Sequence, residues 1–434
     1  MWYERAMAPL LLHYPIAEHT LGNGLRVLVN ADPASPAVAL NLWYGVGSAD
    51  EAASRTGFAH LFEHLMFQGS ANVASGDHLA SMQAAGGHVN ATTSFDRTNY
   101  FETTPPGALE LALWLEADRM ESLTVDQTNL DNQRDVVKEE KRQRYDNVPY
   151  GDVLQLLLAL HFPEDHPYHH TPIGSLAHLD AAHLGDVQGF YHAWYTPSDA
   201  TLVISGAVNQ DAAFALVEAA FGHIPGRPAP HHARPEALPA HHGVPRAVVR
   251  RPVPRDAVHV GWRTPPITHP EHLAVAQALS ILGDGQSARL HRLLVRDQEL
   301  SEGIGTAEFD LARGTSLALV SARAREGVDI ARLEHAVVTE VERLGAEGPT
   351  TAELDRIHAG YERDWLLELA SLDSRADQIN SYAVLHGHAQ GVNTHLAEYL
   401  SVSPEDVAKA ARDWLTPSAC AVLDYRVGDE EAAS

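Results

Sequence analysis

The residues best suited to chemistry in this chain lie in the run His60-Leu61-Phe62-Glu63-His64. In a helix, positions i and i+4 share one face, so the two imidazoles can reach the same metal ion. Glu63 is displaced by one residue, so it need not bind the metal and can face a metal-bound water. The order His-x-x-Glu-His is the inverse of the usual zinc-protease helix motif. The alternative interpretation is two ordinary histidines on an amphipathic helix.

A catalytic zinc site usually has three protein ligands and keeps one position for water. The two histidines therefore need a third partner. Cys420 is the only cysteine and lies in a predicted strand near the C-terminus, so it is excluded. A carboxylate is the natural candidate for the third ligand.

A second predicted helix supplies such a carboxylate. Residues 129–147 (NLDNQRDVVKEEKRQRYDN) are strongly helical by propensity, and Val136 and Val137 are expected to mark the buried side. Glu140 follows them by four and three residues, on the same inward side, whereas Glu139 lies further round toward solvent. A charged residue on a buried face needs a partner, which a metal would supply. Glu140 is therefore favoured over Glu139 as the third ligand.

The motif and its surroundings resemble the pitrilysin, insulin-degrading enzyme and mitochondrial processing peptidase family, the inverzincin zinc peptidases. That family has the same inverted motif, followed at a similar distance by a glutamate ligand on a second helix; here Glu140 stands 76 residues after His64. The similarity spans most of the chain. It includes the segments 22–29 (GNGLRVLV), 45–51 (GVGSADE), 86–101 (GGHVNATTSFDRTNYF), 149–151 (PYG), 166–168 (HPY) and 283–294 (GDGQSARLHRLL).

The resemblance implies a role for each motif residue. His60, His64 and Glu140 would bind one Zn2+ per chain, and Glu63 would be the general base that takes a proton from the attacking water. Several relatives have a second glutamate seven residues before the glutamate ligand, where this chain has Gln133. Glutamine can hydrogen-bond but carries no charge, so a supporting role for Gln133 is an expectation.

Substrate binding is also implied by the resemblance. The stretch 89–101 has the composition of a strand, and relatives use it as the edge strand on which a peptide adds as an extra strand. Backbone hydrogen bonds would come from around Asn90 and Ala91. The alternative is an ordinary edge strand held by core packing. The expected function is a zinc metalloendopeptidase that hydrolyses extended or unfolded peptides. A non-catalytic scaffold subunit, or a metal-dependent hydrolase of non-peptide substrates, is the alternative.

A partner chain is expected for a different reason. Relatives whose C-terminal half completes the site carry there an arginine and a tyrosine seven residues apart, both near the zinc. Arg296 stands at the arginine position, but Gly303 stands at the tyrosine position. This favours a heterodimer in which a homologous subunit supplies the Arg/Tyr pair, as in paired bacterial enzymes, with a homodimer as the alternative. Arg296 itself can equally be a surface charge paired with a neighbouring carboxylate.

The chain contains an internal duplication. Residues 186–203 (DVQGFYHAWYTPSDATLV) and 406–423 (DVAKAARDWLTPSACAVL) share six residue types at a constant offset of 220. Each copy is typical of a helix, a Thr-Pro-Ser turn and an apolar strand. We therefore expect an N-terminal zinc-binding domain (1–224), a Pro-rich linker (225–254) and a homologous, non-catalytic C-terminal domain (255–434).

The fold class follows from the mixture of elements. Alternating strands at 25–30 and 37–44 combine with long amphipathic helices such as 106–121. This indicates α+β domains, each a mostly antiparallel sheet with helices packed on one face. The family resemblance implies the same architecture, with two domains forming half of a clamshell.

Composition excludes several partners. The formal net charge of −26 argues against nucleic acid and anionic membranes, and no apolar run is long enough to span a bilayer. One cysteine allows no internal disulfide, which agrees with a cytoplasmic location. The 27 histidines include three doublets in Pro-rich stretches that are expected to be solvated: His169-His170, His231-His232 and His241-His242.

Overall fold

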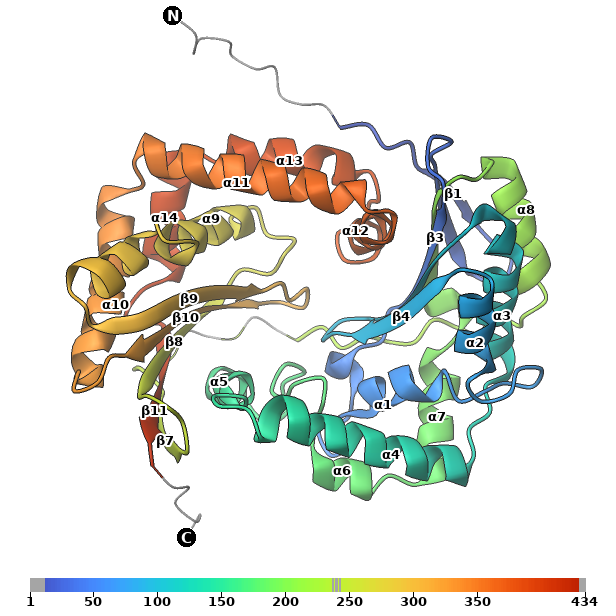
Figure 1. Ribbon diagram of the computed structural model, residues 1–434, viewed down its shortest axis with the longest axis horizontal. Coiled ribbons are helices and arrows are strands. Elements are labelled where there is room, and N and C mark those ends of the chain that lie inside the picture. Colours follow the sequence, from blue (N-terminus) through green and yellow to red (C-terminus); the bar gives the residue numbers. More distant parts are fainter. Residues whose placement is uncertain (1–11, 236–237, 239–240, 242, 429–434) are drawn as a thin grey trace, which may run out of the picture. The chain divides into compact units, whose positions relative to one another are not determined.

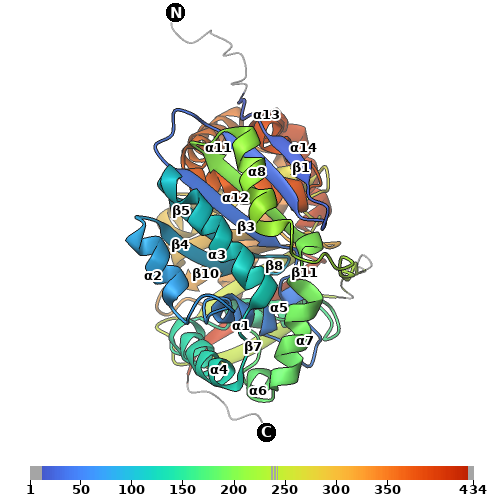
Figure 2. The ribbon, with the colours of Figure 1, turned by 90° about the vertical axis from the view of Figure 1, so that its right-hand side faces the viewer.

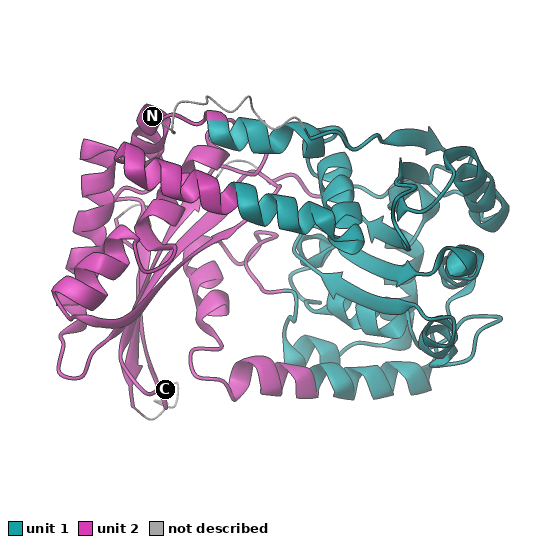
Figure 3. Ribbon diagram, turned by 45° about the horizontal axis from the view of Figure 1, so that its top comes forward, with its two compact units in different colours: residues 1–138, 172–232, 362–400 teal, residues 139–171, 233–361, 401–434 magenta. Residues whose placement is uncertain are grey.

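The computed structural model describes residues 12–235, 238, 241 and 243–428. The chain divides into two compact units (Figure 3). Unit 1 comprises residues 1–138, 172–232 and 362–400, and unit 2 comprises residues 139–171, 233–361 and 401–434. Each unit therefore contains most of one half of the chain and one segment from the other half.

Unit 1 is built on a six-stranded sheet in the order β1-β2-β6-β3-β5-β4 (Figure 1). Its strands are β1 (Ala17–Thr20), β2 (Arg26–Ala31), β3 (Val38–Tyr44), β4 (His88–Thr93), β5 (Thr98–Thr104) and β6 (Ala200–Gly206). Neighbouring strands are antiparallel, except that β2 and β6 are parallel. Among the described strands β4 pairs with β5 alone, so it is an edge of the sheet.

Both faces of this sheet are covered. Helices α3 (Leu109–Ser122) and α8 (Gln210–Phe221) cross one face (Figure 2). Helix α12 (Leu372–Val384), which comes from the C-terminal half, packs against β3 and β6. Polar side chains of β3 can be buried there because Oδ1 of Asp377 accepts hydrogen bonds from Asn41 Nδ2 (3.1 Å) and Trp43 Nε1 (2.8 Å).

Unit 2 contains a five-stranded sheet in the order β7-β11-β8-β10-β9. Its strands are β7 (Arg246–Arg251), β8 (Ala257–Thr264), β9 (Ser301–Phe309), β10 (Ser316–Ala324) and β11 (Cys420–Val427). Only the β7–β11 pairing is parallel among those described. On one face lie α9 (His272–Gly283), α10 (Ile330–Glu347) and α14 (Pro404–Trp414), and against the other lies α5 (Val153–His161).

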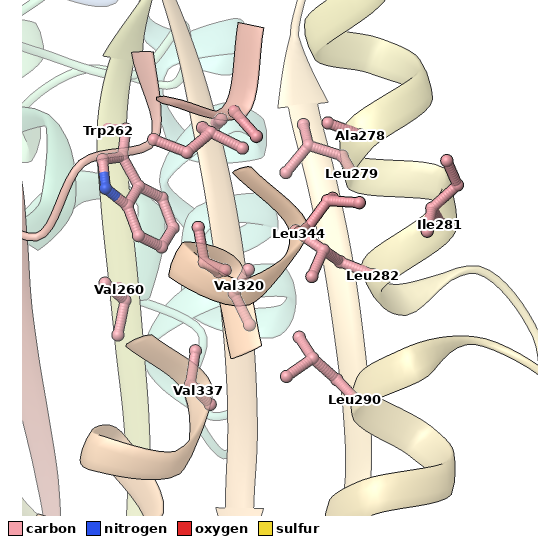
Figure 4. Close-up of a cluster of buried hydrophobic side chains, with 14 of the residues drawn as sticks. Val260, Trp262, Ala278, Leu279, Ile281, Leu282, Leu290, Val320, Val337 and Leu344 are labelled. Carbon is pink, nitrogen blue, oxygen red and sulfur yellow. The ribbon is translucent and has the colours of Figure 1, made fainter. Parts of the chain in front are cut away.

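Side-chain alternation along the strands separates two hydrophobic clusters in unit 2. Val260, Trp262 and Val320 join the core under α9 and α10, which Figure 4 shows in close-up. Leu319 and Leu423, of the opposite parity, pack with α5 instead. The sheet is therefore buried on both sides, as in unit 1.

The duplication expected from the sequence is confirmed by the topology. The order β2-β6-β3-β5-β4 in unit 1 corresponds to β7-β11-β8-β10-β9 in unit 2. In each copy a helix, α7 (Leu184–Trp194) or α14, is followed by the Thr-Pro-Ser turn and then by the strand with a parallel neighbour. The α+β fold class with two sheets is likewise confirmed.

Two features differ from the simple expectation. The compact units are not the contiguous stretches 1–224 and 255–434, because residues 139–171 pack in unit 2 and residues 362–400 pack in unit 1. These two segments give each sheet a helix on its second face, α5 and α12. The expected linker 225–254 includes β7, which is a strand of the second sheet; part of this stretch lies outside the described residues.

The remaining helices complete the two units. They are α1 (Phe58–Leu65), α2 (Asp77–Ala84), α4 (Gln127–Lys141), α6 (Leu176–Asp180), α11 (Thr351–Ala370) and α13 (Gly391–Ser401). A π-helical segment, Arg142–Asp146, continues α4, and another, His291–Asp297, precedes β9. Among the described residues, no helix combines the length and the apolar character needed to cross a membrane.

Candidate metal centre

Helix α1 carries the His-x-x-Glu-His motif and is anchored at its start. Glu51 caps it, since its carboxylate accepts hydrogen bonds from the backbone N–H groups of Gly57 (2.8 Å) and Ala59 (2.7 Å). Gly57 has φ +96°, and a Cβ there would lie 2.9 Å from the carbonyl oxygen of Ile173. Only glycine fits this approach without a shift.

The two motif histidines lie together on α1. The ring centroids of His60 and His64 are 4.9 Å apart, in an edge-to-face arrangement. Phe58, Leu61, Phe62 and Leu65 are buried and fix the helix in the core of unit 1. The i, i+4 spacing therefore gives the shared face expected from the sequence.

Helix α4 brings Glu140 to these histidines. One ligand atom from each of His60, His64 and Glu140 lies within 4.8 Å of the other two. Glu140 lies in the last turn of α4, three residues after the buried Val137. Glu140 has 17% of its side chain exposed and Glu139 has 55%, in agreement with the preference for Glu140.

The buried side of α4 differs in one respect from the expectation. Val137 is fully buried, but Val136 is 47% exposed, so the expectation for Val136 is wrong. The helix buries Leu130 and Val137, two turns apart, and Gln133 and Glu140 follow them with the same spacing. Gln133 is partly buried on this face, two turns before Glu140.

The donor set fits zinc. Two imidazole nitrogens and one carboxylate oxygen leave a fourth position for water, as catalytic zinc sites require. Zinc bonds of about 2.0–2.2 Å place the ligand atoms of one ion roughly 3–4 Å apart. Small side-chain rotations would therefore bring all three residues onto a single ion.

Glu63 has a hydrogen-bond partner on the edge strand β4. Its Oε2 accepts a hydrogen bond from Oγ1 of Thr93 (2.6 Å), the last residue of β4. The sequence interpretation did not single out Thr93. A hydroxyl residue within the predicted substrate stretch 89–101 was the signal that could have found it.

The predicted substrate strand is the edge strand β4, but the stretch 89–101 is not one strand. It contains β4, a tight turn in which the Ser94 N–H donates to the Arg97 carbonyl (2.9 Å), and the start of β5. Asn90 is exposed and Ala91 is buried. The Ala91 N–H donates to Oδ1 of Asn90 (2.9 Å), so a peptide using this N–H would replace that side chain as acceptor.

Behind α1 lies a buried charged network that the sequence did not reveal. Burial raises the pKa values of Glu102 and Glu116 to about 7, against the opposing effect of the Arg119 guanidinium. Burial and the same guanidinium lower the pKa of His78 to about 3. Arg119 lies over the ring of Tyr100, whose hydroxyl donates to the carbonyl of Phe62 (3.4 Å). The network thus supports the backbone of the motif helix.

The positions at which relatives carry the Arg/Tyr pair lie in unit 2. Arg296 has 62% of its side chain exposed and pairs with the neighbouring Asp297 at 2.8 Å. Gly303 lies on β9, opposite Arg323 of β10. Arg296 is thus a surface charge paired with an adjacent carboxylate, the simpler of its two interpretations.

Two family models match the chain. One, described as Insulinase (Peptidase family M16), matches residues 26–166, and the other, described as Peptidase M16 inactive domain, matches residues 182–361. His60, Glu63, His64 and Glu140 all lie in the first match. The "inactive" label belongs to the second half of the chain.

Relatives and solved structures agree with this. The chain is 29% identical to the zinc protease PqqE of Helicobacter pylori over 406 residues, covering 91% of this chain and 89% of that protein. It is 27% identical over 216 residues to the mitochondrial-processing peptidase subunit beta of Blastocladiella emersonii, covering 50% and 46%. The crystal structure of a protease from Helicobacter pylori superposes with a TM-score of 0.89 at 28% identity, covering 95% of this chain and 99% of that one. The chain belongs to peptidase family M16.

Proposed function

We propose that this chain is a zinc-dependent endopeptidase that hydrolyses extended or unfolded peptides. The observation that carries the proposal is the convergence of one ligand atom each from His60, His64 and Glu140 within 4.8 Å, with Glu63 beside them on α1. The names of relatives support zinc and proteolysis, since PqqE of Helicobacter pylori is named a zinc protease.

Each part of the site has its own task. When bound, zinc supplies a polarised water and a positive charge that stabilises the developing oxyanion. Glu63, oriented by Thr93, takes the proton of the attacking water and passes it to the leaving amine. The open edge of β4 offers backbone groups to an extended peptide, which would add as a further strand. Recognition of main chain rather than side chains predicts broad sequence tolerance.

The experiment is cleavage of an unstructured fluorogenic peptide by the full chain. Activity should disappear with a chelator and return when zinc is restored, because the water is activated at the metal. Activity that survives complete metal removal, checked by metal analysis, would overturn the proposal. A chain that binds no zinc and cleaves nothing would instead favour the scaffold alternative.

The proposal also includes a homologous partner subunit. Arg296 points to solvent with Asp297, and Gly303 has no side chain, so this chain offers no Arg/Tyr pair at the position where relatives have one. A homologous subunit carrying that pair would complete the site in a heterodimer. Assaying the chain alone and with such a subunit from the same genome separates this from a self-sufficient homodimer, which would be fully active by itself.

A further inference from the structure

A second cluster of potential metal ligands lies within unit 2. It consists of His272, at the start of α9, Glu308, near the end of β9, and Asp310, just beyond that strand. One ligand atom from each residue lies within 4.8 Å of the other two. The ligand atoms of His60, His64 and Glu140 lie within the same distance of one another.

Each ring nitrogen of His272 lies near one of the two carboxylates. His272 Nδ1 lies 3.5 Å from Glu308 Oε1, and His272 Nε2 lies 3.3 Å from Asp310 Oδ1. An ordinary N–H···O hydrogen bond is shorter, about 2.9 Å. The His272 Nδ1 also lies 3.3 Å from the Pro265 carbonyl oxygen, so Nε2 is the ring nitrogen left to bind an ion. The distance from Nε2 to Asp310 Oδ1 is within the roughly 3–4 Å expected between two ligand atoms of one zinc ion.

The local structure explains why these residues meet. Alternate side chains of a strand point to one face, so Thr306 and Glu308 both face α9. The hydroxyl of Thr306 indeed donates to the carbonyl of Leu279 on α9 (3.3 Å). Asp310 continues the same spacing past the end of β9. His272, in the first turn of α9, lies beside both carboxylates.

The charges in the cluster favour a cation. Only 11% of the Glu308 side chain is exposed, and its Oε1 is shielded from solvent and accepts no hydrogen bond from the described residues. Among the described residues, the charged groups that shift the pKa of Glu308 are His272 and the carboxylate of Asp310. A buried carboxylate beside another carboxylate is costly without a cation. Among the described residues protonated His272 is the cation beside them, and a divalent ion bound to neutral His272 could take that place.

A third cluster of potential ligands among the described residues differs because it already contains a cation. His78, Glu102 and Glu116 in unit 1 also offer ligand atoms within 4.8 Å. There the guanidinium of Arg119 donates to both carboxylate oxygens of Glu116, so the cluster already contains a fixed cation. The cluster of unit 2 has the same kinds of donor without an arginine.

The internal duplication relates Glu308 of this cluster to a residue beside the motif helix. In unit 1, Tyr44 of β3 pairs with Thr98 of β5, which pairs with Thr93 of β4. Thr93 in turn contacts Glu63. In unit 2, Trp262 of β8 pairs with Ala318 of β10, which pairs with Glu308 of β9. Glu308 therefore occupies in the second copy the sheet position that Thr93 occupies in the first.

We propose that His272, Glu308 and Asp310 bind a divalent cation, Zn2+ by preference, which links the end of β9 to the start of α9. One imidazole and two carboxylates suit zinc and leave room for water. Asp310 has 69% of its side chain exposed, so the ion can exchange with solvent and binds less tightly than at the motif. This site does not depend on the proposed peptidase activity.

The test measures zinc bound by the full chain after the motif site has been removed with His60→Ala and His64→Ala. Equilibrium dialysis against Zn2+ followed by metal analysis should find one remaining equivalent with micromolar affinity. Adding His272→Ala should abolish it. His335→Gln, which changes an exposed histidine of α10, is the matched control and should leave it unchanged.

Glu308→Gln is a second test in case His272→Ala misfolds, because glutamine preserves the shape of the glutamate side chain. It should weaken the remaining equivalent at least tenfold, as loss of a ligand does, while the circular dichroism of the metal-free protein stays the same. Zinc should also raise the melting temperature of the motif-deleted chain, and not that of its His272→Ala derivative. The proposal is overturned if the motif-deleted chain binds no zinc at micromolar concentration, or if neither added change alters the amount bound.

Discussion

Thr93 Oγ1 donates a 2.6 Å hydrogen bond to Oε2 of Glu63, which joins the last residue of the edge strand β4 to the motif helix α1. The strand proposed to receive the peptide thus orients the carboxylate proposed to act as base. This bond couples the placement of substrate and base.

Thr93→Val should lower kcat about tenfold with little change in KM or zinc content. The hydroxyl donates to Glu63, which is not one of the three proposed ligands, and a hydrogen bond to a charged group contributes about 1.5–3 kcal/mol. Thr93→Ser keeps the hydroxyl and should restore most of the activity. Steady-state kinetics with metal analysis checks this; an unchanged kcat in the valine variant would contradict the positioning role.

Glu140→Gln should reduce the zinc bound at the motif site from one equivalent to a small fraction, whereas Glu139→Gln should leave it unchanged. The two residues are adjacent, but Glu140 turns toward the histidines and 55% of the Glu139 side chain is exposed. Because the neutral amide is a poor zinc ligand, affinity should fall by a hundredfold or more. Equal zinc contents in the two variants would refute the assignment of the third ligand.

Asp377→Ala should destabilise the chain by about 2–4 kcal/mol. One carboxylate oxygen of Asp377 on α12 accepts hydrogen bonds from Asn41, Trp43 and Asn99 (2.8 Å), and each buried donor left without an acceptor costs about 1–3 kcal/mol. Asp364→Ala, at a residue with 62% of its side chain exposed, should change stability little. Denaturant unfolding measures both; equal losses would show that the carboxylate does not fasten α12 to the sheet.

His232 should give unit 1 a stability that declines in alkaline solution. Burial alone would lower its pKa, but hydrogen bonds to Asp199 (2.9 Å) and Asp50 (3.0 Å) raise the pKa to about 9. The folded state therefore binds the proton more tightly than the unfolded state. The contribution is complete below pH about 6.5 and is lost as the pH rises through about 9.

His232→Gln should consequently remove about 1–2 kcal/mol of stability at neutral pH, after allowance for partial exposure. The difference between variant and wild type should shrink between pH 7 and 10. Urea unfolding at several pH values provides the test. A difference that stays constant over this range would show that the histidine is not held protonated.

The motif and the duplication could be predicted from the sequence because both depend on local spacing. The i, i+4 rule placed His60 and His64 on one face, and helical phase favoured Glu140 over Glu139. The repeated helix, Thr-Pro-Ser turn and strand correctly indicated two similar sheets. The turn Ser94–Arg97 within the stretch 89–101 was not predictable, because it lacks the glycine that marks many hairpins.

Contacts between distant parts of the chain were not predictable in this way. Asn41 and Trp43 bury polar atoms only because Asp377 arrives from the other half of the chain. Glu116 and Arg119 have the spacing of an ordinary surface ion pair on a helix, yet both are buried. His232 was expected to be solvated, but two carboxylates from distant segments enclose it.

The measurement that tests the central claim most directly is a paired one on Glu63→Gln: zinc content, and cleavage of the fluorogenic peptide with any partner subunit the wild type needs. Because Glu63 is assigned as base and not as ligand, the variant should keep one zinc per chain at the motif and lose cleavage by 10²-fold or more. If zinc is lost as well, Glu63 belongs to the ligand set. If zinc and cleavage are both retained, Glu63 is not the base and the proposed mechanism is wrong.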